Sequence, residues 1–103
     1  MTVPEAQRID KWLWHARFAR TRAAAQRLAL SGHVRINREK VKAASRLVHP
    51  GDVLTLALGR EVRVLRVVGI ADRRGSFEAA RRLYDEHGAT PPRLNSEPAN
   101  SGA

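Results

Sequence analysis

Apolar positions near the amino terminus recur at the spacing of one helix face. They are Ile9, Trp12, Leu13 and Ala16. This period predicts an α-helix over residues 10–18 with the Asp10 carboxylate as its N-cap. Thr21 offers a second N-cap before the alanine-rich stretch 22–30, and Gly32 is placed to end that helix. Two short helices joined by "ARTR" therefore form a helical hairpin.

The hydrophobic period changes from 3.6 to 2 in the segment "HVRIN". Val34 and Ile36 alternate there with Arg35 and Asn37. The alternation predicts a strand with the two apolar side chains inside and the two polar ones outside. A turn over 37–39 leads into "KVK", so the segment is expected to form a β-hairpin, although Asn-Arg is a poorer tight turn than Asn-Gly.

The second half of the chain predicts two longer strands and a third helix. "VLTLAL" (53–58) follows the turn "HPGD" and has the apolar run of a buried strand, and "EVRVLRVVGI" (61–70) continues the sheet. The side chains expected to face inward from this last strand are Val62, Val64 and Val67. Ser76 caps a predicted helix that runs to about His87, with Gly88 as its end.

The fold class that follows is α+β, with the helical hairpin packed on a small, mainly antiparallel sheet. The predicted divisions are a lead-in over 1–7, a domain over 8–70, a carboxy-terminal loop and helix over 71–88, and a tail over 89–103. The tail carries three prolines and little to bury, so it is expected to be disordered.

Charge is unevenly distributed along the chain. Its 19 Lys and Arg face 10 Asp and Glu, a formal net charge of +9. Residues 1–50 hold eleven of the bases and three of the acids, whereas the other 53 residues hold eight bases and seven acids. A polyanion-binding face is therefore expected in the first half, for nucleic acid before membrane.

Other classes of site find little support. The chain has no cysteine, its four histidines lack ligand spacing, and it has no phosphate-binding glycine loop or paired carboxylates. No metal, no cofactor and no catalysis are expected. There is no apolar run near the ~20 residues of a membrane span and no signal-peptide pattern, which predicts a cytoplasmic protein. A basic amphipathic helix can lie on a membrane, but the sheet needs the apolar residues at 12–14 as core.

Residues 8–54 resemble the S-four (ribosomal small-subunit protein four, alpha-L) RNA-binding domain family. The resemblance is carried by "RID", "RFARTR", the glycine after helix two, "VRIN", "VK" and "HPGD". "DKWLW", "RRG" and "LYDE" are similar to the bacterial heat-shock protein fifteen subgroup. That subgroup usually has Asn-Gly at the hairpin, so Asn37-Arg38 predicts a looser or longer turn. Its members carry a longer basic extension than the short neutral tail here.

The resemblance implies an RNA-binding, ribosome-associated protein. In the subgroup the RNA is ribosomal RNA of the large subunit. The implied task is the rescue or recycling, after heat stress, of large subunits that carry a stalled nascent chain with its tRNA. The chain is expected to act as a monomer. Two alternatives stay open, which are a duplex-DNA binder that uses helix two for recognition and a module that docks on ribosomal protein.

The candidate RNA-binding residues surround the helical hairpin and the β-hairpin. They are Arg8, Lys11, Arg17, Arg20, Thr21, Arg22, Arg35, Asn37, Lys40 and Lys42. Arginine offers a planar fork of donors for phosphate oxygens, and the N-terminus of helix two adds free N–H groups. The β-hairpin residues are expected to face the same groove as the arginines. Charge reversal at Arg17, Arg20 or Arg22 should weaken RNA binding with little change in melting temperature.

The aromatic residues have two possible roles, as core or as stacking surfaces for bases. Trp12 lies on the apolar stripe and is expected in the core, and Trp14 lies beside the stripe and is expected to assist. Phe18 is the best stacking candidate and is left open between the two roles.

Overall fold

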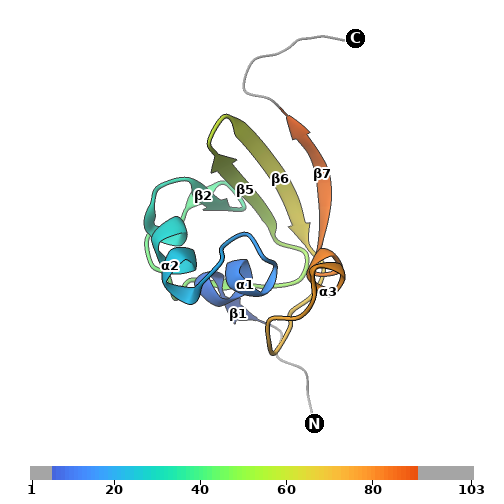
Figure 1. Ribbon diagram of the computed structural model, residues 1–103. Coiled ribbons are helices and arrows are strands. Elements are labelled where there is room, and N and C mark those ends of the chain that lie inside the picture. Colours follow the sequence, from blue (N-terminus) through green and yellow to red (C-terminus); the bar gives the residue numbers. More distant parts are fainter. Residues whose placement is uncertain (1–5, 91–103) are drawn as a thin grey trace.

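Two helices lie against one face of a five-stranded antiparallel sheet in the computed structural model, which describes residues 6–90 (Figure 1). The helices are α1 (Ile9–His15) and α2 (Arg22–Leu30). The strand order is β3-β2-β5-β6-β7. These strands are β2 (Val34–Ile36), β3 (Glu39–Lys40), β5 (Val53–Leu58), β6 (Glu61–Val67) and β7 (Tyr84–Thr90). A separate two-stranded sheet pairs β1 (Gln7–Arg8) with β4 (Leu47–Val48). The predicted α+β fold is confirmed.

The core lies between the two helices and the sheet. Its fully buried members include Ile9, Trp12, Leu13, Ala25, Ala29, Val34, Ile36, Leu54, Leu56 and Leu65. Trp12 keeps its one polar atom satisfied, because the indole Nε1–H donates to the Gly69 carbonyl at 3.0 Å. The prediction of Trp12 and Leu13 as core residues is therefore confirmed, and α1 is fixed to the sheet through them.

Helix α1 is shorter than the predicted 10–18 and begins differently. Its N-cap residue is Arg8, which makes no capping hydrogen bond through its side chain, and Asp10 lies inside the first turn. The helix ends because Arg17 adopts a left-handed conformation with φ +66°. The Phe18 N–H then donates to the Leu13 carbonyl at 2.9 Å and the Arg17 N–H to the Trp14 carbonyl at 3.1 Å, which is the Schellman pattern of helix termination.

Helix α2 begins and ends where the sequence predicts. The Thr21 hydroxyl accepts a hydrogen bond from the Ala24 N–H at 3.0 Å. Gly32 follows the helix with φ +90°, a conformation that glycine adopts without the cost of a Cβ clash. The position of this N-cap matters for function, since it fixes where the free N–H groups of the first turn lie.

The β2–β3 hairpin has a tight two-residue turn, so the prediction of a looser or longer turn was wrong. Ile36 pairs with Glu39, which leaves Asn37 and Arg38 as the loop, with φ +50° and +79°. Two positive φ values in succession are typical of the type I′ turn, which suits the twist of a hairpin. Asn37 also accepts a hydrogen bond from the Val53 N–H and donates one to Asp52. These bonds hold the turn against β5.

We expect Arg38→Gly to stabilise the protein by about 1 kcal/mol, because a Cβ is costly in the left-handed region and glycine has none. The hydrogen bond that the Arg38 carbonyl accepts from Arg35 belongs to the backbone and is kept. Urea unfolding measures the change. Arg38→Ala is the control, since it removes the same charge and keeps the Cβ, and equal stability of the two variants would contradict the explanation.

The inward face of β6 was predicted correctly for Val67 and wrongly for Val62 and Val64. Leu65 and Val67 are buried beneath the helices, whereas Val62 and Val64 are only partly buried on the other face. Arg63 therefore shares the inward face with Leu65, and it stands opposite Leu56 of β5. A guanidinium at the border of the core needs a partner, and the carboxy-terminal segment supplies it.

The carboxy-terminal segment forms a short helix and a strand in place of the predicted helix to His87. Helix α3 (Phe77–Arg81) has the predicted cap, as the Ser76 hydroxyl accepts from the Ala79 N–H at 3.1 Å. Residues Tyr84–Thr90 then pair with β6 as β7, and Gly88 lies within that strand. The predicted tail over 89–103 is thus partly strand, and residues 91–103 lie outside the described part of the chain.

Candidate nucleic-acid interface

Three arginines where α1 leads into α2 have different partners, with Arg17 and Arg20 in the loop and Arg22 as the first residue of α2. The Arg17 Nε and Nη2 donate to the Gly75 carbonyl at 3.0 and 2.8 Å, which leaves its other N–H donors uncommitted. The Arg22 guanidinium lies 3.5 Å from an Asp10 carboxylate oxygen. Arg20 is exposed and has no hydrogen-bond or ion-pair partner among residues 6–90. Together with Arg8, these residues are called the hinge cations below.

Asp10 is the buried anchor of this group. Arg8 donates to both of its carboxylate oxygens at 3.1 and 3.0 Å, and the Lys11 N–H donates at 2.7 Å. Burial tends to raise the pKa of Asp10, but the hydrogen bonds from Arg8 and Lys11 and the charges of Arg8 and Arg22 outweigh burial and hold that pKa below its ordinary value. The carboxylate therefore stays charged and orients two half-exposed guanidinium groups. The interpretation of Asp10 as a helix cap was wrong and missed this role.

His15 adds no charge to the hinge at neutral pH. Its ring is buried, and Nδ1 lies 3.0 Å from the Ala71 carbonyl. Burial lowers the pKa of His15, and the charges of Lys11 and Arg22 lower it further against the opposing effect of the Ala71 bond. Lys11 itself, on α1, is half-buried.

The N-terminus of α2 points into the same region. Thr21 satisfies one N–H group of the first turn, and the remaining free N–H groups and the positive end of the helix dipole favour an anion there. Thr21 is thus placed as predicted, as a capping residue that sets the helix start between Arg20 and Arg22.

The β-hairpin residues do not share this region, contrary to the prediction of one common groove. The Lys40 side chain lies beside Gly32, at the opposite end of α2 from the hinge cations. Lys40, Lys42 and Arg46, called the hairpin cations below, line a groove of about 540 Å³. Arg35 lies across from Thr55 on the outer face of the sheet, and the Asn37 side chain is engaged in the turn.

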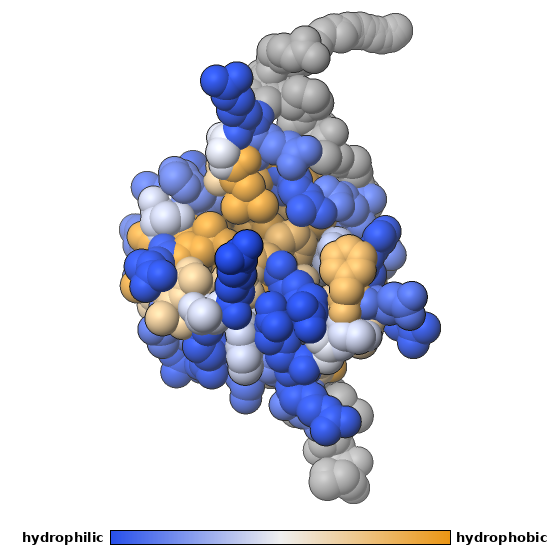
Figure 2. All heavy atoms as spheres, viewed as in Figure 1, coloured by the Kyte–Doolittle hydropathy of each residue, from blue (hydrophilic) through white to orange (hydrophobic). Residues whose placement is uncertain are grey.

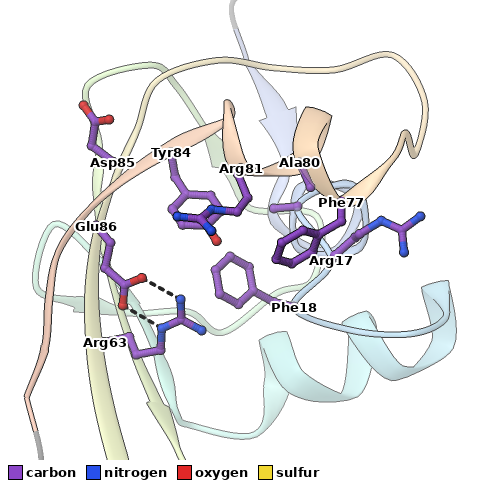
Figure 3. Close-up of a pocket in the computed structure, with 10 residues that line it drawn as sticks. Arg17, Phe18, Arg63, Phe77, Ala80, Arg81, Tyr84, Asp85 and Glu86 are labelled. Atoms are coloured by element: carbon purple, nitrogen blue, oxygen red, sulfur yellow. Dashed lines mark hydrogen bonds and ion pairs between the residues drawn. The ribbon is translucent and has the colours of Figure 1, made fainter.

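An aromatic cavity of about 550 Å³ lies beside the hinge, between the α1–α2 loop, α3, β6 and β7 (Figure 3). Phe18 stacks on Trp12 with ring centroids 6.2 Å apart and contacts Tyr84 at 5.1 Å. Arg63 lies over the Phe18 ring at 5.0 Å and donates to both Glu86 oxygens at 2.7 and 2.6 Å. Phe18 therefore joins the core with one face and borders the cavity with its rim.

The face that carries the helices is mixed in polarity. In Figure 2, apolar surface opens between hydrophilic side chains on this face. Phe77 is the most exposed of the large hydrophobic side chains in residues 6–90, at 61%. Trp14 is half-buried, and Arg74 lies 5.9 Å from its ring and donates to its carbonyl at 3.1 Å. Sequence patterns did not predict Phe77, Arg63 or Arg81 as site residues, because these residues come together only when α3 packs beside the sheet.

Comparison with known proteins assigns this arrangement to a family. The family model of the S4 domain matches residues 7–54. The heat shock protein 15 homolog of Aeromonas salmonicida is 34% identical over 96 residues, which cover 93% of this chain and 70% of that protein. The chain belongs to the heat shock protein 15 family. The heat shock protein 15 homolog of Haemophilus influenzae is 38% identical over 79 residues, and the chain spans 60% of its length.

The fold of the heat shock protein 15 family extends beyond the S4 match. The trimeric structure of heat shock protein 15 from Vibrio cholerae superposes with a TM-score of 0.73 at 36% identity, covering 80% of this chain and 82% of that one. The predicted resemblance is therefore confirmed. Two absences are also observed within residues 6–90, where no group of side chains is placed to hold a metal ion and no helix is long and apolar enough to cross a membrane.

In this heat shock protein 15 family member, Arg17 occupies a position where helices usually place glycine. We expect Arg17→Gly to be more stable than Arg17→Ala by about 1 kcal/mol, because both lose the bonds to Gly75 and only alanine keeps the left-handed strain. Urea unfolding of the two variants tests this. If alanine proves as stable as glycine, the left-handed termination of α1 is not the strained element.

Proposed function

We propose that this chain is a non-enzymatic binder of structured RNA and that the hinge cations make its main contact. The observation that carries the proposal is the arrangement around Arg20. This exposed guanidinium has no partner within residues 6–90, and it lies between Arg17 and Arg22, whose positions are fixed by Gly75 and Asp10. Membership of the heat shock protein 15 family and the S4 match over the hinge support the same function.

The proposed mechanism is recognition of backbone shape and charge. Arginine forks bind phosphate oxygens with two N–H donors, and the free N–H groups at the start of α2 donate to a further phosphate oxygen. Because Asp10 and Gly75 already hold the neighbouring side chains, less conformational entropy is lost when RNA binds. Few base-reading side chains face the hinge, so we expect preference for folded RNA over any particular sequence.

The hairpin cations are proposed as a second backbone contact. Lys40 lies beside Gly32 at the far end of α2, a helix of nine residues and so about 14 Å long at 1.5 Å per residue. Arg46 lies nearer the hinge, since its carbonyl accepts from the Ile9 N–H at 2.7 Å. Lys40 and Lys42 remain in the proposed site on this basis. Arg35 faces the other side of the sheet and Asn37 is engaged in its turn, so neither belongs to the contact surface that we propose.

We further propose that the RNA is ribosomal RNA of the large subunit. The proposed task is the rescue or recycling of large subunits that carry a stalled nascent chain, and the tRNA on such a subunit is a second proposed partner. The names of the relatives support the link to heat stress, and the large-subunit role rests on the motifs that resemble the heat-shock protein fifteen subgroup. The chain is proposed to bind as a monomer, although the Vibrio cholerae relative was solved as a trimer.

Competition separates this proposal from its alternatives. A structured RNA hairpin should displace labelled RNA at least tenfold more effectively than a DNA duplex of equal length, because α2 carries mainly alanine and leucine and offers few groups to read base edges. Equal competition would favour the duplex-DNA alternative. Ribosome pull-down after nuclease digestion tests docking on ribosomal protein, and capture that survives digestion would contradict RNA binding as the main contact.

A further inference from the structure

The aromatic cavity beside the hinge has the shape and chemistry of a ligand site. Its volume of about 550 Å³ lies within the ~300–1,000 Å³ of small-molecule sites. Three aromatic side chains line it from three separate elements. They are Phe18 from the α1–α2 loop, Phe77 from α3 and Tyr84 from β7 (Figure 3).

Phe77 is the aromatic residue of this cavity that contributes least to the core. It is 61% exposed, whereas Phe18 and Tyr84 are half-buried and pack against Trp12. An aromatic ring left in solvent loses the stabilisation that burial would supply. Arg81 lies 5.8 Å from the ring centroid, so a cation already accompanies the exposed aromatic surface.

The charges around the cavity suit an anion with a planar group attached. Arg17, Arg63 and Arg81 line it. Arg63 and Glu86 neutralise each other through two hydrogen bonds, and the Arg63 bonds hold the pKa of Glu86 below its ordinary value. Arg17 and Arg81 are therefore the lining cations without an ion-pair partner among residues 6–90. The Asp85 carboxylate points away from the cavity in Figure 3.

The cavity is also continuous with the hinge cations. Arg17 lies in both, and its two hydrogen bonds to the Gly75 carbonyl tie the hinge to the loop that leads into α3. The Ser76 cap fixes the start of α3, and so the position of Phe77 as its first residue. A phosphate held by the uncommitted donors of Arg17 would therefore place its attached base at the mouth of the cavity.

We propose that this cavity receives one unpaired base of the bound RNA, stacked on Phe77, with its phosphate on Arg17 and Arg81. This inference rests on the proposed function, and it adds a specificity that the hinge alone lacks. Every base offers a planar face for stacking on an aromatic ring or a guanidinium, and such contacts are a common way for proteins to hold splayed nucleotides. The preferred RNA then has an unpaired nucleotide next to a helix.

The test compares two RNA hairpins that differ in one nucleotide. One carries a single bulged 2-aminopurine, and the other pairs that base within the stem. We expect the full chain to bind the bulged hairpin about tenfold more tightly, within the range of base–aromatic stacking. The 2-aminopurine fluorescence should fall on binding, because stacking quenches this base.

Variants of Phe77 assign the effect to the cavity. Phe77→Ala should remove the preference and the quenching, while it leaves affinity for the paired hairpin within twofold. Phe77→Leu keeps apolar bulk without a ring face and should behave like alanine, whereas Phe77→Trp should keep both signals. Val68→Ala removes another exposed apolar side chain that does not line the cavity, and it should change neither.

Different results would contradict the base pocket and the proposed RNA binding by the hinge. If the wild-type chain binds both hairpins equally and with strong salt dependence, the base pocket is wrong and RNA binding by the hinge stands. If Phe77→Ala keeps the preference, the base lies elsewhere and the pocket is again wrong. If neither hairpin binds, the proposed function itself fails. Displacement of the quenched base by an aromatic peptide, without loss of the hairpin, would identify the cavity as a peptide site.

Discussion

Replacing Asp10 by asparagine is expected to destabilise the fold by about 1–3 kcal/mol, because the buried carboxylate accepts several hydrogen bonds that an amide cannot all replace. The Asp10 side chain is fully buried and accepts hydrogen bonds from Arg8 and the Lys11 N–H, with Arg22 nearby. An amide of the same shape accepts fewer of these bonds and carries no charge to offset the two guanidinium groups. Urea unfolding at neutral pH measures the change.

A matched control is available in the exposed ion pair between Arg46 and Glu39. Arg46 and Glu39 are 3.0 Å apart, and the Glu39 side chain is largely exposed. Glu39→Gln should cost less than about 1 kcal/mol, as exposed pairs do. If Asp10→Asn costs no more than Glu39→Gln, Asp10 is not the anchor of the hinge.

The same residue gives stability a definite dependence on pH. The pKa of Asp10 is lower in the folded chain than its ordinary 3.8, so its contribution is complete above about pH 4 and is lost as pH falls through the folded pKa. His15 acts in the same direction at higher pH. Its folded pKa is below the ordinary 6.5, so the unfolded chain takes up a proton first and stability declines as pH falls below 6.5. Asp10→Asn should flatten only the lower part of this profile.

Charge reversal at Arg20 is expected to weaken binding of structured RNA by tenfold or more while the melting temperature changes by only about 1–2 °C. Arg20 is exposed and makes no side-chain hydrogen bond or ion pair within residues 6–90, and a carboxylate at that point repels the phosphate that Arg20 should bind. Fluorescence anisotropy with a labelled hairpin and thermal unfolding measure the two quantities.

The other hinge arginines should behave differently from Arg20, which amends the expectation drawn from the sequence. Arg22→Glu places a carboxylate near Asp10 and removes a cation from it, so both affinity and stability should fall. Arg17→Glu loses two hydrogen bonds to Gly75. Arg60→Glu is the control, since Arg60 is exposed in the β5–β6 turn and the change in net charge is the same. Equal loss of RNA affinity in Arg20→Glu and Arg60→Glu would point to net charge alone.

Local signals predicted the parts of the fold that are stabilised locally. Helix α2 follows from the Thr21 cap and Gly32, and the β2–β3 hairpin follows from alternation alone. Helix α1 ends early because Arg17 adopts a left-handed conformation, which an arginine in the sequence does not predict. The helix predicted from Ser76 to about His87 ends at Arg81, because the residues from Tyr84 onward pair with β6.

The sequence predicted most of the cationic residues of the candidate site but not how they are grouped in space. The cationic residues of the hinge were identified because arginine and a helix N-terminus together favour phosphate. The different positions and partners of Arg20, Arg22 and Lys40 were not predicted. They depend on Asp10 beneath the hinge and on the direction in which the chain runs from α2 into the β-hairpin. The aromatic cavity was not predicted because it depends on β7, and the sequence predicts a helix in that segment.

The salt dependence of RNA affinity, measured on wild-type and Arg20→Glu chains, shows whether the hinge cations bind RNA phosphates. For the wild-type chain, log affinity should fall linearly with log salt, with a slope on the order of −0.7 to −0.9 for each phosphate neutralised. Arg20→Glu should reduce the magnitude of that slope by about one, and Arg60→Glu should leave it unchanged. A salt-insensitive affinity, or the same slope in wild-type and Arg20→Glu chains, would contradict RNA binding through the hinge cations.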